Sequence, residues 1–296
     1  MSVEEIPLVA ALDAGEEDAL GDEMRSTVLG HGRRTARVVV LLHGLTASPR
    51  TWREFARVRH ARGETVLIPR LPRHGHADRM THALAGLDVA ELRAQAERIV
   101  DVAAELGDEI VVVGFSLGGT LALHLAQREP RIARTIAIAP LLGVRAVPAP
   151  WTGPFRALLA RLPNRFVWRN PFDRGRTDPP HGYPRYATHS LAAGLTLGAA
   201  LEADARTAPP VAPRIEIVRN AGETTVSNAA LDVLVARWRA AGATDVRVLR
   251  LDGLPFSHDV IEPELRRAPA ARFLPLLHAL LDAPPASADG TLNARG

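Results

Sequence analysis

The residues best suited to do chemistry lie at positions 111–119, Val-Val-Val-Gly-Phe-Ser-Leu-Gly-Gly, where a Gly-x-Ser-x-Gly motif follows an apolar, β-branched run. The run predicts a strand, and the apolar spacing after the motif predicts a helix. A strand that turns so tightly into a helix holds its serine in a strained conformation with the hydroxyl exposed. Gly114 and Gly118 suit this turn because a Cβ at either position would crowd the neighbouring strand and helix. Ser116 is therefore the candidate nucleophile, and the Leu117 amide at the helix start is a candidate oxyanion donor.

A second oxyanion donor is predicted at the end of another apolar run, residues 37–42. This run predicts a strand that ends in His43-Gly44-Leu45-Thr46. A strand ending in His-Gly lets the next backbone amide, that of Leu45, face Ser116. We expect His43 to support this loop by hydrogen bonding rather than to transfer protons.

The candidate general base is His258, in the Gly- and Pro-rich loop after the strand predicted at residues 245–251. Of the 11 histidines, it alone follows the last predicted strand, and from there it can reach Ser116. His74 and His76 could suggest a metal site, but no third ligand lies nearby in the sequence and the chain has no cysteine. We therefore expect this pair to serve the structure of its loop.

Three carboxylates compete to orient the imidazole of His258. Glu223 follows the strand predicted at residues 214–218, so it lies where strand ends gather in a parallel sheet. Asp252 ends the strand that precedes His258 and is its main rival. Asp259 adjoins His258, but neighbouring residues in an extended loop point apart. We favour Glu223 as the acid and leave Asp252 open.

Taken together, these motifs resemble the α/β-hydrolases, and among them the bacterial carboxylesterases and monoacylglycerol lipases. The order along the chain is Ser, acid, His, which is typical of that superfamily. The matching segments are His43-Gly44-Leu45-Thr46, Leu71-Pro72-Arg73-His74-Gly75-His76, Gly114-Phe115-Ser116-Leu117-Gly118-Gly119, Glu223-Thr224-Thr225-Val226 and Ser257-His258-Asp259. The chain departs from the pattern by carrying Glu223 where many relatives have Asp, and Arg73-His74-Gly75-His76 in place of Gly-His-Gly.

The wider pattern predicts an α/β fold in which helices cover both faces of a mostly parallel sheet. Strands are predicted at residues 27–29, 37–42, 65–68, 109–113, 131–138, 214–218 and 245–251, and helices at 51–62, 88–106, 117–127, 227–241 and 264–281. The resemblance implies a helical cap inserted after the sixth strand. We expect a flexible leader at 1–26, a core at 27–142 and 209–283, a strand-free cap at 143–208 and a frayed tail at 284–296.

The predicted cap holds seven of the 13 aromatic residues of the chain. They are Trp151, Phe155, Phe166, Trp168, Phe172, Tyr183 and Tyr186. Large rings at helical spacing usually pack together as a small core. Alternatively, some of them line an apolar channel for an acyl or aromatic group. The sequence leaves both readings open.

Composition narrows the class of protein. Cysteine and lysine are both absent, so disulfides and Cys-based zinc sites are excluded and all 36 basic residues are arginine. The formal net charge is only +3 and arginine is interleaved with acids, which argues against nucleic acid as a partner. The start is acidic, which is unlike a signal peptide, and no apolar stretch approaches the length of a membrane span. We expect a soluble, cytoplasmic protein without stable membrane anchoring, and the sequence leaves the oligomeric state open.

The expected activity is hydrolysis of short-to-medium acyl esters or monoacylglycerol-like esters by two-step acyl transfer, with Ser116, His258 and Glu223 as the triad and no metal or organic cofactor. A thioesterase, lysophospholipase or amidase could use the same residues. A non-catalytic ligand-binding protein on this scaffold would be expected to have lost a triad member, whereas Ser116 and His258 are both present. A lipase acting at a membrane surface is a further alternative, which an exposed apolar cap would favour.

Overall fold

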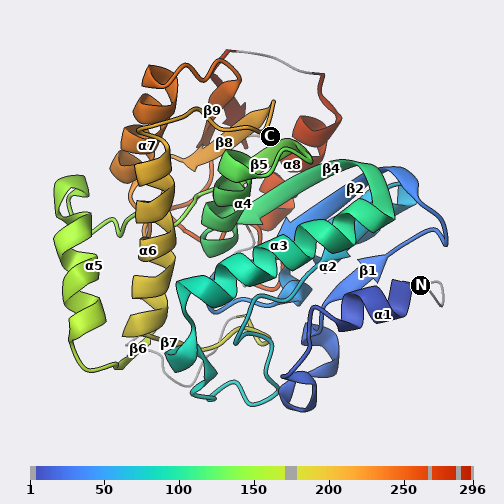
Figure 1. Cartoon of the computed structure of the whole chain (residues 1–296), viewed down its shortest axis with the longest axis horizontal. Helices are drawn as coiled ribbons and strands as arrows, with labels where there is room; N and C mark the ends of the chain where they lie inside the picture. Colours follow the sequence, from blue (N-terminus) through green and yellow to red (C-terminus); the bar gives the residue numbers. More distant parts are fainter. Residues whose placement is uncertain (1–4, 171–178, 266–268, 285–287, 295–296) are drawn as a thin grey trace.

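A twisted eight-stranded sheet forms the centre of the molecule in the computed structural model, which describes residues 5–170, 179–265, 269–284 and 288–294 (Figure 1). Its strand order is β1-β3-β2-β4-β5-β8-β9-β10, and every pair is parallel except β1 with β3. The strands are β1 (Thr27–Leu29), β2 (Thr35–Leu42), β3 (Thr65–Ile68), β4 (Gly107–Phe115), β5 (Ile132–Ile138), β8 (Ile215–Asn220), β9 (Val246–Asp252) and β10 (Gly290–Asn293). The predicted mostly parallel α/β architecture is confirmed.

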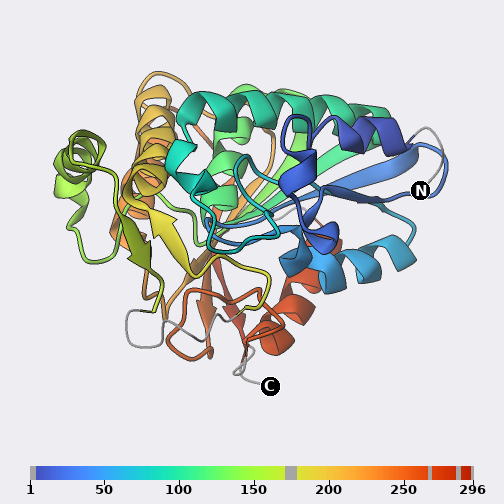
Figure 2. The ribbon, with the colours of Figure 1, turned by 90° about the horizontal axis from the view of Figure 1, so that it is seen from below.

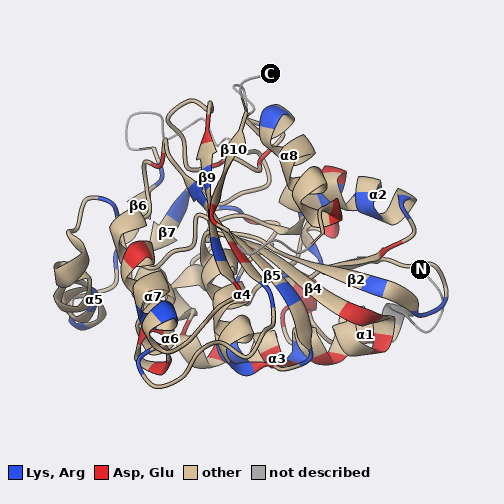
Figure 3. Cartoon of the chain, turned by 90° about the horizontal axis from the view of Figure 1, so that it is seen from above, with Lys and Arg blue, Asp and Glu red and all other residues tan. Residues whose placement is uncertain are grey.

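Helices cover both faces of this sheet (Figure 3). On one face lie α2 (Arg53–Ala61) and α8 (Ala270–Asp282), whose rings Phe55 and His278 stack 4.1 Å apart. On the other lie α3 (Val89–Leu106), α4 (Leu117–Arg128) and α7 (Asn228–Ala240). The central strands are therefore covered on both sides, and residues 38–42 and 111–113 are fully buried. This explains why they read as unbroken apolar runs.

The segment between β5 and β8 forms a separate layer beside the sheet (Figure 2). It contains α5 (Thr152–Arg161), α6 (Thr188–Asp204) and an antiparallel pair, β6 (Phe166–Trp168) with β7 (Arg185–Ala187). Two expectations were wrong here. The insertion follows the fifth strand of the chain rather than the sixth, and it contains strands, which are too short to give a periodic signal.

The tail was also wrongly predicted, because β10 extends the sheet as a parallel neighbour of β9. Asp289 anchors it by accepting from the Val248 amide at 2.8 Å and pairing with Arg239 at 2.9 Å. The sequence of β10, Gly-Thr-Leu-Asn, is not strongly apolar, and its residues alternate between partly buried and exposed. It forms a strand because β9 otherwise presents an unpaired edge.

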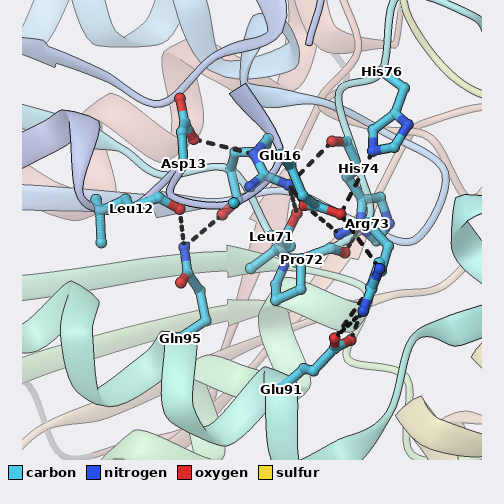
Figure 4. Close-up of polar contacts among 12 residues, drawn as sticks. Leu12, Asp13, Glu16, Leu71, Pro72, Arg73, His74, His76, Glu91 and Gln95 are labelled. Carbon is cyan, nitrogen blue, oxygen red and sulfur yellow. Dashed lines mark hydrogen bonds and ion pairs between the residues drawn. The ribbon is translucent and has the colours of Figure 1, made fainter. Parts of the chain in front are cut away.

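Parts of the leader, which we expected to be flexible, pack against the core. Val9 and Leu12 are buried, and residues 12–24 wrap around the loop that follows β3. Asp13 and Glu16 both pair with the buried Arg70, and the Arg73 amide donates to Glu16 at 3.2 Å (Figure 4). The leader shows no apolar periodicity, because it is held by ion pairs to Arg70 together with a few scattered buried apolar side chains, among them Val9 and Leu12.

Candidate active site

The turn between β4 and α4 holds Ser116 in a strained backbone conformation, with φ 54° and ψ −115°. The Ser116 amide donates to the Ile138 carbonyl at 2.9 Å, which fixes the turn against β5. Glycine is required on both sides. A Cβ on Gly114 would lie 2.2 Å from the Gly118 carbonyl oxygen, and one on Gly118 would lie 2.4 Å from the Leu42 carbonyl oxygen. The tight turn predicted from the motif is present, since β4, the turn and α4 follow one another directly.

The three predicted polar residues meet at the carboxyl edge of the sheet. His258 Nε2 lies 2.9 Å from Ser116 Oγ, and His258 Nδ1 lies 2.9 Å and 3.0 Å from the two carboxylate oxygens of Glu223. The rival acids are engaged elsewhere. Asp252 accepts from Arg250 Nε at 2.9 Å, and Asp259 pairs with Arg169 at 2.7 Å. Glu223 is thus the carboxylate that the structure places against the imidazole.

Backbone amides hold the Glu223 carboxylate in place. Its Oε1 accepts from the amides of Thr224, Thr225 and Val226 at 2.8, 2.6 and 3.2 Å. Burial alone would raise the pKa of Glu223, but His258 and these amides outweigh it and hold the pKa below its ordinary value. Glu223 therefore stays ionised and can stabilise a positive charge on the imidazole.

The loop that carries His258 is fastened to the loop that carries Glu223. The Ser257 amide donates to the Gly222 carbonyl at 3.1 Å, and Asn220 Nδ2 donates to the Ser257 carbonyl at 2.6 Å. These bonds set the separation of base and acid independently of the side chains themselves.

The loop of residues 44–48, which we call the oxyanion loop after its predicted role, carries the Leu45 amide. The Gly44 carbonyl accepts from the Ala47 amide at 3.1 Å and from His43 Nδ1 at 3.0 Å. In a planar trans peptide the N–H points opposite to the carbonyl, so the Leu45 N–H points away from these donors. Leu45 and Ser116 line the same cavity. Leu117 is the first residue of α4, so its amide has no acceptor inside the helix.

Two buried histidines brace the oxyanion loop. His43 Nε2 accepts from the Leu71 amide at 3.1 Å, which leaves its proton on Nδ1. His74 Nε2 accepts from the Thr46 amide at 3.3 Å, and its Nδ1 donates to the Pro72 carbonyl at 2.7 Å. Burial lowers the pKa of His74 to about 4 and that of His43 well below its ordinary value, so both rings are neutral at neutral pH. Both therefore act on loop structure, as expected.

The candidate catalytic residues open into a cavity of about 490 Å³, within the usual size of small-molecule sites. Its apolar lining includes Leu45, Phe115, Leu141, Val144, Leu191 and Phe256. Its polar lining includes Thr51, Thr224, Thr225 and Glu262. The polar lining and Phe256 were missed by sequence reasoning, because they lie in loops whose side-chain directions no periodicity reports.

The aromatic residues of the insertion divide between the two readings that the sequence left open. Trp168 and Tyr186 line the cavity. Phe155 and Phe166 pack against the core, Tyr183 is buried, and Trp151 is 64% exposed. Phe172 lies outside the described residues.

The chain also matches known proteins. A model of the Alpha/beta hydrolase family matches residues 39–290, which is most of the chain. The chain belongs to this family. This α/β-hydrolase is 29% identical over 258 residues to a pimeloyl-[acyl-carrier protein] methyl ester esterase from Aromatoleum aromaticum, covering 76% of the chain and 93% of the relative. It is 34% identical over 116 residues to a thermostable monoacylglycerol lipase from a Bacillus species, covering 39% of the chain and 45% of that lipase.

Solved structures agree with this α/β-hydrolase in fold. The monoacylglycerol lipase of Paleococcus ferrophilus superimposes with a TM-score of 0.63 at 18% identity, covering 86% of the chain and 97% of the lipase. A metagenome-derived lipolytic enzyme superimposes with a TM-score of 0.66 at 20% identity, covering 89% of the chain and 99% of the enzyme.

Three features bear on whether the protein binds membranes, nucleic acid or metal ions. In the described ranges, no helix is both long enough and apolar enough to cross a membrane. Arginine positions are interspersed with aspartate and glutamate positions along the ribbon (Figure 3), and many of these residues form ion pairs, such as Arg131 with Asp101. The same part of the chain holds no group of three or more His, Asp or Glu residues arranged to bind a metal ion.

Proposed function

We propose that this α/β-hydrolase cleaves carboxylic esters through an acyl-enzyme formed on Ser116. His258 Nε2 takes the proton from Ser116 Oγ as that oxygen attacks the ester carbonyl. The backbone amides of Leu45 and Leu117 stabilise the tetrahedral oxyanion, and Glu223 stabilises the imidazolium. The alcohol leaves with the proton from His258, and water then releases the acid by the same steps. None of these steps uses a cofactor.

The observation that carries the proposal is the unbroken contact from Ser116 Oγ through the His258 ring to Glu223, at 2.9 Å and 2.9 Å. The strained turn places Ser116 in the lining of the cavity, and the buried Glu223 carboxylate supplies the charge that such a contact needs. The related esterase and lipase support an ester as substrate, because each is named for hydrolysing one.

The cavity favours an ester with an apolar acyl group of short to medium length, or a monoacylglycerol-like ester. Aliphatic and aromatic side chains can cover the acyl group, while the threonines face a polar alcohol portion. Thioesters, lysophospholipids and amides are the alternative substrates, because the same groups attack any acyl carbon.

Labelling with a fluorophosphonate tests the proposal. We expect mass spectrometry to place the label on Ser116 alone, since Ser116 lines the cavity, lies 2.9 Å from His258 Nε2 and precedes the free amide at the start of α4. Label on another serine, or none on the folded protein, would contradict it. A panel of matched esters, thioesters and amides then ranks the substrate classes, and we expect the esters to give the highest kcat/KM.

The remaining expectations belong to the same proposal. We propose that residues 143–208 act as a cap over a core formed by 27–142 and 209–283, and that the enzyme works in the cytoplasm on small molecules without binding nucleic acid. Size-exclusion chromatography with light scattering would establish the oligomeric state.

A further inference from the structure

A second cluster of polar side chains lies beside the candidate active site and takes no part in the proposed reaction steps. Its members are Ser48, Thr51, His181 and Glu262, and each is at most 4% exposed. His181 Nδ1 lies 2.9 Å from Ser48 Oγ, and His181 Nε2 lies 3.2 Å from Glu262 Oε2. Thr51 Oγ1 donates to Glu262 at 3.0 Å. Buried polar groups of this kind cost free energy unless they are paired, so their joint presence calls for an explanation.

On one side, this cluster is bonded to the oxyanion loop. Ser48 is the last residue of that loop, three residues after the Leu45 amide. A second bond joins the same two segments, since the Tyr183 amide donates to the Thr46 carbonyl at 2.7 Å. Thr46 has a positive φ of 69°, which a β-branched residue keeps only when its surroundings enforce it. The insertion thus holds the oxyanion loop at two points.

On its other side, the cluster reaches the loop of the candidate base. Glu262 lies four residues after His258, and the Val260 amide between them donates to the His258 carbonyl at 2.8 Å. The Glu264 amide also donates to Glu262, at 3.1 Å. Burial would raise the pKa of Glu262, but His181 and these donors hold it below its ordinary value, so the carboxylate stays ionised. His181 therefore lies between the segments that carry the oxyanion donor and the base.

We propose that His181 is a positioning residue, which keeps the Leu45 amide and His258 in register with Ser116. This inference rests on the proposed function, because it assigns His181 a purpose in that reaction. Held between Ser48 and Glu262, the ring fixes the distance between the two loops from within the insertion. The insertion therefore supports the oxyanion loop as well as lining the cavity.

Substitution of His181 tests this role through the split between kcat and KM. For His181→Ala we expect kcat on a chromogenic ester to fall between about tenfold and a hundredfold, as small misplacements of catalytic groups do. KM should change by less than about twofold, because His181 is not among the residues that line the cavity. Ser48→Ala should show a smaller fall of the same kind. His181→Gln, which can keep one of the two contacts, should recover part of the loss.

His278→Ala is the control, because it removes another histidine, partly buried on α8, whose ring stacks on Phe55. It should lower Tm while kcat stays within about twofold of the parent. A trifluoromethyl ketone inhibitor gives a second readout, since its serine adduct carries an oxyanion. Its Ki for His181→Ala should rise by the same factor by which kcat/KM falls.

A folded His181→Ala protein with unchanged kcat would overturn the proposal, and so would a fall in kcat without a rise in Ki. Neither result would affect the proposed function, which fails separately if the fluorophosphonate does not label Ser116.

Discussion

Replacing Glu223 with glutamine should impair the enzyme by changing the tautomer of His258, in addition to removing a charge. In the structure, Glu223 Oε1 accepts three backbone amides, from Thr224, Thr225 and Val226. A glutamine would keep its carbonyl oxygen at this position, because an NH2 group there would face three donors. The NH2 group then replaces Oε2, which lies 3.0 Å from His258 Nδ1, while the carbonyl oxygen, 2.9 Å from Nδ1, is already shared by three amide donors.

A donor at this position leaves Nδ1 as an acceptor and puts the imidazole proton on Nε2. That proton then faces Ser116 Oγ, 2.9 Å away, so the ring cannot take the serine proton. A wrong tautomer in a serine triad costs about 10⁴ in kcat. At about 1.36 kcal/mol for each tenfold change, this is about 5 kcal/mol of transition-state stabilisation. We expect a fall of about 10³ to 10⁴, smaller than the roughly 10⁶ expected for Ser116→Ala.

The assay is kcat for a short-chain chromogenic ester, with circular dichroism and Tm to verify folding. Glu223→Ala places no donor against Nδ1, so it should retain more activity than Glu223→Gln. Asp252→Asn is the control carboxylate, since its partner is Arg250, and it should have little effect. The reasoning is refuted if folded Glu223→Gln keeps more than about a tenth of kcat, or if Asp252→Asn proves the more damaging.

Three further outcomes follow from the structure. Gly44→Ala would place a Cβ 3.3 Å from Ser116 Cβ and 3.2 Å from the Phe115 ring. We therefore expect kcat to fall while Tm stays close to that of the parent. An unchanged kcat would show that the loop moves to accommodate the methyl group. Burial lowers the pKa of His74, His124 and His278 to about 4, below an unfolded value of about 6.5. Between these two pH values the unfolded chain therefore binds more protons than the folded chain. The free energy of unfolding, measured with urea, should fall as the pH drops from about 6.5 toward 4. A constant value would contradict the neutral state of these rings. On an ester panel, kcat/KM should rise from acetate to short-to-medium acyl chains, by up to about 0.8 kcal/mol for each buried methylene, and a steady decline from acetate would mean that the cavity holds no acyl group.

The parts of the fold that follow from the sequence are those where burial is nearly complete. Residues 38–42 and 111–113 are shielded on both faces, so their side chains must be apolar whatever their neighbours are, and this leaves a readable pattern. The turn at Ser116 is equally readable, because its two glycines are required by contacts within the turn and with β2. The placements of Ser116, His258 and Glu223 follow from this, since each residue comes after a strand whose carboxyl end lies at the same edge.

Other parts depend on partners far away in the sequence. β10 has only four residues and owes its existence to the free edge of β9, which no local pattern reports. Asp13 and Glu16 look like solvated charges until Arg70 is placed beside them. His181 and Glu262 are 81 positions apart, and only the folded chain brings them within 3.2 Å of each other.

Residues 12–24 wrap around the loop after β3, and through that loop the leader is connected to the oxyanion loop. Substitutions in the leader could therefore change the reaction rate. The Gly21 amide donates to the Gly75 carbonyl at 3.0 Å, and the neighbouring His74 holds the Thr46 amide. Substitutions at Asp13 or Glu16 should therefore shift the proposed oxyanion donor at Leu45 without altering any residue that lines the cavity. For the same reason, replacing this leader with that of a relative would replace residues that support the oxyanion loop. We expect kcat to change although the lining of the cavity stays the same.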